Sequence, residues 1–131
     1  MQFQFYLTGN FNGVEFNIDD EDQDGKKRVE KLIELSGKGY VQETNTFERD
    51  AKNILVIGSF PGSSKIQKAI DNEIKIIDFE ILQLGLNQTS PTDYFHLNNL
   101  TNENARRRCF QPGEEEVEIQ SGLLNFYYRL F

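Results

Sequence analysis

The chain has 131 residues, a net charge of −7 and a hydrophobic content of 37%, which is enough for one packed core. No apolar run approaches the roughly 18 residues that a membrane-spanning helix needs, and the first residues lack the basic and apolar regions of a signal peptide. Because Cys109 is the only cysteine and His96 the only histidine, a disulfide framework and a cysteine-based zinc site are excluded. We therefore expect no bound metal, no cofactor and no membrane partner.

The charge is distributed unevenly along the chain. Residues 1–24 contain six acidic residues and no lysine or arginine, whereas residues 25–75 have a net charge of +3 and residues 76–131 one of −4. The acidic total argues against a protein that coats nucleic acid by charge alone. An anion-binding surface is expected in the middle of the chain, although lysines scattered on solvated helix faces would give the same count.

The first part of the chain predicts a strand, a loop and a helix. An aromatic run at residues 3–7 predicts a strand that ends at Thr8-Gly9, and the acidic residues that follow predict a solvated loop. Apolar residues then recur at helical spacing over 26–35, and Gly37 and Gly39 supply stop signals.

The middle of the chain predicts a compact α/β unit. A continuous apolar run at 53–58 is typical of a strand buried on both faces in a parallel sheet. The remaining predicted elements are strands at 40–42 and 74–77 and helices at 65–72 and 78–86. Helices that join strands in this order imply right-handed crossovers and a mainly parallel sheet.

After residue 86 the pattern changes. Residues 87–116 are polar with weak periodicity, residues 117–119 alternate like a strand, and residues 123–131 are rich in aromatics. We expect residues 87–131 to form a C-terminal extension that docks on the core or becomes ordered on a partner. The candidate partner-binding residues are the apolar ones at its end, Leu123, Phe126, Tyr127 and Phe131.

Three local patterns resemble a BRCT domain. They are Phe5-Tyr6-Leu7-Thr8-Gly9, then Leu32-Ile33-Glu34-Leu35-Ser36-Gly37-Lys38-Gly39-Tyr40, then Ile54-Leu55-Val56-Ile57-Gly58 with Gly62-Ser63-Ser64-Lys65 and Ile74-Lys75-Ile76-Ile77-Asp78. The nearest branch is that of NAD-dependent DNA ligases and the replication factor C large subunit, since the tryptophan of tandem members is absent. The resemblance implies a BRCT-like domain at residues 1–86, with a four-stranded parallel sheet flanked by helices.

The resemblance also implies a phosphate-binding site. A threonine hydroxyl, a glycine N–H and a lysine at the first turn of a helix can converge on a phosphate, and the helix start adds its own N–H groups. The matching residues are Thr8, Gly9 and Lys65. Members that bind a DNA 5′-phosphate add a basic residue at the start of the first helix, which places Lys26 and its neighbour Arg28 in the candidate site.

We expect a non-catalytic binding module of DNA replication or repair that recognises a phosphate on a DNA 5′ end or on a phosphorylated protein. Such a role implies the cytoplasm, at the nucleoid, in a bacterium, or the nucleus in a eukaryote. The alternative is a structural adaptor that binds a protein, or forms a homodimer, through the C-terminal aromatic segment. An enzyme is not expected: no catalytic set of residues is recognisable, and Lys65 has the wrong spacing from Gly58 and Gly62 for a P-loop.

Overall fold

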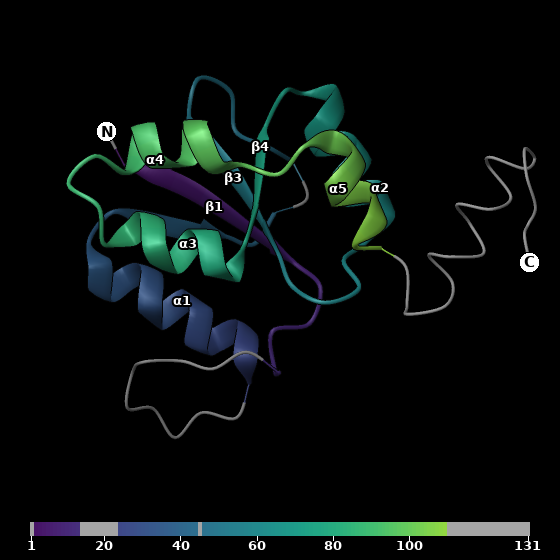
Figure 1. The fold of residues 1–131 in the computed structure, drawn as a ribbon. Coiled ribbons are helices and arrows are strands. Elements are labelled where there is room, and N and C mark those ends of the chain that lie inside the picture. Colours follow the sequence, from purple (N-terminus) through teal and green to yellow (C-terminus); the bar gives the residue numbers. More distant parts are fainter. Residues whose placement is uncertain (1, 14–23, 45, 110–131) are drawn as a thin grey trace, which may run out of the picture.

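The computed structural model describes residues 2–13, 24–44 and 46–109, which form a sheet with helices on both faces (Figure 1). The sheet has four strands in the order β2-β1-β3-β4, and each neighbouring pair is parallel. The strands are β1 (Phe3–Thr8), β2 (Gly39–Gln42), β3 (Lys52–Ile57) and β4 (Lys75–Asp78). All-parallel sheets have helices on both faces, so both faces of the central strands β1 and β3 are covered.

Helices cover the two faces in separate layers (Figure 1). The described helices are α1 (Gly25–Ser36), α2 (Ser63–Asp71), α3 (Phe79–Leu86), α4 (Pro91–Asn98) and α5 (Asn102–Arg107). One core joins α1 and α3 to the sheet through Val29, Ile33 and Leu82, and the other joins α2 and α5 to it through Ile66 and Ala105.

The central strands supply both cores because successive side chains point to opposite faces. In β1, Phe3, Phe5 and Leu7 belong to the core under α1 and α3, whereas Tyr6 belongs to the core under α2. All residues of β3 from 54 to 57 are buried, two on each side. A strand buried on both faces has no polar alternation, which explains the continuous apolar run in the sequence.

The predicted fold class, α/β with a four-stranded parallel sheet flanked by helices, is confirmed, and the arrangement matches the description of a BRCT-like fold. Each of the seven elements predicted up to residue 86 is present, with ends displaced by at most two residues. The largest displacement is at α2, which begins at Ser63 rather than Lys65 because Gly62 is its N-cap.

Residues 87–109 pack onto the sheet as α4 and α5. The Phe95 side chain is fully buried, and its ring centroid lies 5.4 Å from that of Phe3. Residue 85 must be a glycine, since a Cβ there would overlap the Phe95 ring. The sequence predicted neither helix, because each buries a single side chain, Phe95 in α4 and Ala105 in α5, and so has no apolar stripe.

The predicted strand at 117–119 and the candidate partner-binding residues Leu123, Phe126, Tyr127 and Phe131 lie outside the described residues. The acidic run at 19–22 lies outside them too. Within the described part of the chain, no helix has the length and apolar character needed to cross a membrane.

Candidate functional site

The loops that leave β1 and β3 run together at the carboxyl end of the sheet. Gly58 N–H donates to the Thr8 carbonyl at 2.9 Å, and Asn10 and Ser59 exchange backbone hydrogen bonds of 2.8 and 2.9 Å. Gly9 has a φ of +95°, and a Cβ at this residue would lie 2.9 Å from the Ser59 carbonyl oxygen. Only glycine satisfies both the left-handed backbone and the close approach, so Gly9 sets the spacing of the two loops.

The Thr8 hydroxyl lies beside the start of α2. Its Oγ1 accepts a hydrogen bond of 3.1 Å from the N–H of Gly62, the N-cap residue. This bond uses an oxygen lone pair and leaves the hydroxyl hydrogen for a ligand. The helical hydrogen bonds begin with Ile66 N–H and the Gly62 carbonyl, so the N–H groups of residues 63–65 precede them, and no side chain caps them at Gly62. The Thr8 hydroxyl therefore lies at the end of α2 that carries these backbone N–H groups.

Lys65 and Lys26 add positive charge at the same end of the sheet. The half-buried Lys65 donates through Nζ to the Thr44 carbonyl at 3.4 Å, just beyond β2. Burial lowers the pKa of Lys65, and the charges of Lys26 and Lys68 lower it further. Because α1 follows β1 and α2 follows β3, both helices start at the carboxyl end of the parallel sheet, where the positive charges of Lys26 and Lys65 repel each other. A bound anion would offset this repulsion and favour the charged form of Lys65.

A chain of short hydrogen bonds fixes the start of α1 against the loop after β1. Asn10 Oδ1 accepts from Asn12 N–H, and Asn12 Oδ1 accepts from Gly25 N–H, both at 2.7 Å. Gly25 is buried, and a Cβ there would overlap the backbone of Phe11. These contacts hold Lys26, the next residue, in place relative to Gly9 and Thr8.

Arg28 is placed differently from Lys26. Residues two apart on a helix do not share a face, so Arg28 lies on another side of α1, and its Nε atom is buried. Four of the five candidate residues, Thr8, Gly9, Lys65 and Lys26, are thus brought to the carboxyl end of the sheet. The role of Arg28 in phosphate binding stays a prediction.

Sequence reasoning missed Phe60, which lies between the bridge residue Ser59 and the N-cap Gly62. Its φ is +49°, and its side chain is 51% exposed. A bulky residue in the left-handed region is a genuine outlier, and such strain is found preferentially at functional sites. Gly58-Ser59 before it and Pro61-Gly62 after it predict a turn, but nothing in the sequence predicts that the φ of Phe60 is positive.

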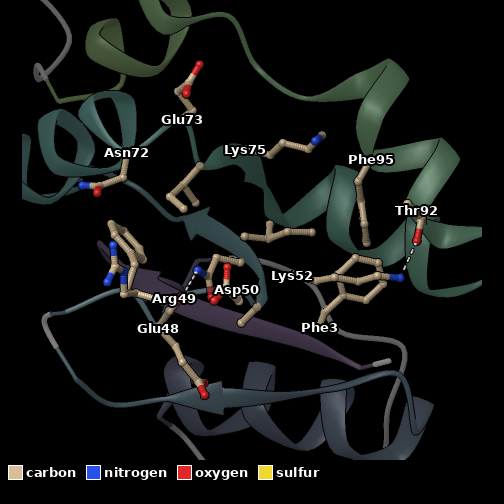
Figure 2. Close-up of a pocket in the computed structure, with 15 residues that line it drawn as sticks. Phe3, Glu48, Arg49, Asp50, Lys52, Asn72, Glu73, Lys75, Thr92 and Phe95 are labelled. Carbon is tan, nitrogen blue, oxygen red and sulfur yellow. Dashed lines mark hydrogen bonds between the residues drawn. The ribbon is translucent and has the colours of Figure 1, made fainter.

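A hollow lies at the opposite, amino end of β3 and β4 (Figure 2). It has a volume of about 440 Å³, and its charged lining consists of three basic and three acidic side chains, Glu48, Arg49, Asp50, Lys52, Glu73 and Lys75. Lys52 is already held, since its Nζ lies 3.2 Å from Thr92 Oγ1 and 5.1 Å from the Phe3 ring centre. Because the numbers of acidic and basic side chains are equal, the charge of this hollow favours neither an anionic nor a cationic ligand.

Among the described residues, no three His, Cys, Asp or Glu side chains gather where they could hold a metal ion. Comparisons of the chain with known protein families, with curated proteins and with solved structures gave no match. The resemblance to BRCT domains therefore rests on the sequence motifs and on the arrangement of the sheet and helices.

Proposed function

We propose that this protein is a non-catalytic binding module of DNA replication or repair, and that the carboxyl end of its sheet binds a phosphate group. The phosphate belongs to a DNA 5′ end or to a phosphorylated protein. The observation that supports the proposal is that the Thr8 hydroxyl, the start of α2, and Lys65 and Lys26 in the first turns of their helices all lie at this end of the sheet.

The chemistry of this site suits a tetrahedral anion such as phosphate. A phosphate has several oxygens arranged tetrahedrally, so it can accept from a hydroxyl, from backbone N–H groups and from ammonium groups at the same time. The uncapped start of α2 contributes N–H groups and the positive end of the helix dipole. Lys65 and Lys26 contribute charge, and the ligand offsets their mutual repulsion.

The half-exposed Phe60 ring favours the DNA end as the source of the phosphate. An aromatic ring held beside a phosphate site can stack on the terminal base, and each stacked base contributes about 1–3 kcal/mol to binding. A phosphorylated serine or threonine has no equivalent group to stack. Phe60 thus separates the two sources experimentally.

The test is fluorescence anisotropy with a labelled duplex that has a recessed 5′-phosphate, compared with the same duplex lacking that phosphate. A phosphopeptide and its unphosphorylated form make up a second pair. We expect the phosphate to tighten binding in at least one pair, with a preference for the DNA, and we expect Lys65→Glu to abolish this difference.

Lys75→Glu is the matched control, because it makes the same change of charge at the amino end of the sheet. This variant should bind both duplexes somewhat more weakly, because it is more negative, but the duplex with the 5′-phosphate should still bind more tightly than the one without it. Equal binding of the phosphorylated and unphosphorylated members of both pairs would overturn the proposal.

A further inference from the structure

The two outer strands of the sheet are covered to different degrees. At β4, Leu100 N–H donates to the Ile76 carbonyl at 2.8 Å, so the chain after α4 closes that edge. At the other side, no strand within residues 2–13, 24–44 and 46–109 pairs with the outer edge of β2. An uncovered strand edge presents N–H and C=O groups to which another chain can bind.

The register of β2 identifies the groups at this edge. Phe3 N–H donates to the Lys38 carbonyl at 3.1 Å, and Phe3 pairs with Gly39. In a parallel pair, alternate residues direct their backbone groups toward the neighbour. Residues 38, 40 and 42 therefore face β1, and the N–H and C=O groups of Gly39 and Val41 point outward.

A hollow of about 530 Å³ lies between β2 and α1 and extends to Gln2 and Gly37 at the amino end of β2. Gly39, Tyr40 and Val41 line it from β2, and Glu30 and Glu34 line it from α1. The two carboxylates are four residues apart, so they lie one above the other on the side of α1 that borders β2. The open edge is thus bordered by acidic groups.

The acidic groups influence one another. Burial raises the pKa of Glu30, and the negative charges of Glu43 and Glu34 raise it further, while Lys26 acts in the opposite direction. Four residues of helix span about 6 Å, and two residues of strand span about 6.6 Å. The spacing of Glu30 and Glu34 therefore matches alternate side chains of a strand placed along β2.

We propose that β2 binds an extended segment of another protein that carries lysine or arginine at alternate residues. The segment adds a fifth strand, with its backbone paired to Gly39 and Val41 and its basic side chains beneath Glu30 and Glu34. On the other face, its remaining side chains meet Tyr40, which is 54% exposed. A second copy of this chain fits poorly, because joining two β2 edges would bring the same carboxylates together.

The probe is the peptide Thr-Lys-Val-Lys-Val-Lys-Thr, titrated into the full-length ¹⁵N-labelled protein and followed by NMR. We expect amide shifts centred on residues 39–43 and on the middle of α1. A peptide of the same composition with its lysines consecutive should bind about tenfold more weakly or not at all, because its charge pattern does not match. Equal binding of the two peptides would overturn the proposal.

Backbone methylation provides a stricter test of strand addition. In a bound strand, alternate N–H groups point toward β2 and away from it. Two further peptides are N-methylated, one at both valines and the other at all three lysines. Only one of these sets of N–H groups can point toward β2, so one peptide should bind and the other should not. If both bind as well as the parent peptide, the contact is electrostatic only and the proposal fails.

The protein variants separate charge from backbone. Glu30→Gln with Glu34→Gln should weaken binding about tenfold, since it removes both carboxylates. Asp71→Asn on α2 is the control of equal chemistry and should have no effect. Val41→Pro removes an outward-pointing N–H but leaves the hydrogen bonds of the sheet intact. It should therefore abolish peptide binding, while its NMR spectrum remains that of a folded protein. Unchanged binding in the double variant, or a stable dimer in sedimentation that excludes the peptide, would contradict the proposal.

Discussion

The two ends of the sheet present different chemistry. At the carboxyl end, the Thr8 hydroxyl lies beside the start of α2, and Lys65 and Lys26 belong to the first turns of α2 and α1. At the amino end there is a hollow of about 440 Å³, but its acidic and basic side chains balance. We therefore expect an anion to bind at the carboxyl end, where hydrogen-bond donors and lysines occur together, and not in the hollow, whose charges balance. Four substitutions or conditions test this distinction, from the largest effect to the smallest.

Phe95→Ala should produce the largest effect, and at the amino end alone. The side chain is fully buried, contacts the rings of Phe3 and Phe5, and lines the hollow. Its removal should lower the free energy of unfolding by about 3–5 kcal/mol in urea denaturation. The phosphate affinity of the folded protein should not change. A loss of stability below about 1 kcal/mol would show that α4 is not firmly seated.

Gly9→Ala should affect the carboxyl end. The added Cβ meets the Ser59 carbonyl oxygen, and the backbone is left-handed, so we expect a loss of about 2 kcal/mol in stability together with weaker phosphate binding. Gly37→Ala is the control, because Gly37 is also left-handed, with a φ of +70°, but has no atom within 4 Å of an added Cβ. It should lose about 1 kcal/mol and keep its phosphate affinity. Similar phosphate affinities in the two variants would contradict the role of Gly9.

The pH dependence tests Lys65. Because its pKa is lowered in the folded protein, the unfolded chain binds more protons between that pKa and about 10.4, the ordinary value for lysine. Stability should therefore rise with pH across this window, by less than about 1 kcal/mol because water still screens the half-buried ammonium group. Phosphate affinity should fall as the pH rises through the lowered pKa. Lys65→Met should remove both pH effects when denaturation and phosphate binding are measured from pH 7 upward. If stability and affinity change with pH in this variant as they do in the wild type, Lys65 is not their source.

Phe60→Gly should produce the smallest change, and of opposite sign. Glycine adopts a φ of +49° without strain, and a half-exposed ring loses little burial, so we expect a gain of about 0.5–1 kcal/mol in thermal unfolding. Affinity for the 5′-phosphorylated duplex should fall, whereas affinity for the phosphopeptide should not. A loss of stability would show that the ring packs against the domain instead of remaining free to stack.

The sequence predicted the sheet and its helices because the pattern there is strong. The continuous run of β3 and the glycines that end β1 and α1 reflect burial on two faces and left-handed turns, which leave clear residue preferences. Thr8, Gly9 and Lys65 could be named because they match the motifs that the chain shares with BRCT domains. The bond between Thr8 and Gly62 and the strained φ of Phe60 depend on how two loops meet, which no local pattern encodes.

The helices after residue 86 escaped prediction for a different physical reason. A helix is visible in a sequence when several apolar residues share a stripe, and α4 and α5 bury only Phe95 and Ala105. The open edge of β2 was equally hidden, since an edge strand and an interior strand of four residues look alike. Both features are properties of the assembled sheet.

The packing of Phe95 on Phe3 has a consequence for synthesis of the chain. The strand made first, β1, lies in the middle of the sheet, yet part of its cover arrives with α4, more than ninety residues later. Residues 95–100 supply partners for β1 and for the edge of β4. These partners do not yet exist while the ribosome is still producing α3. Contacts this distant in sequence slow folding, so we expect the nascent chain to complete its native structure only after α4 has emerged.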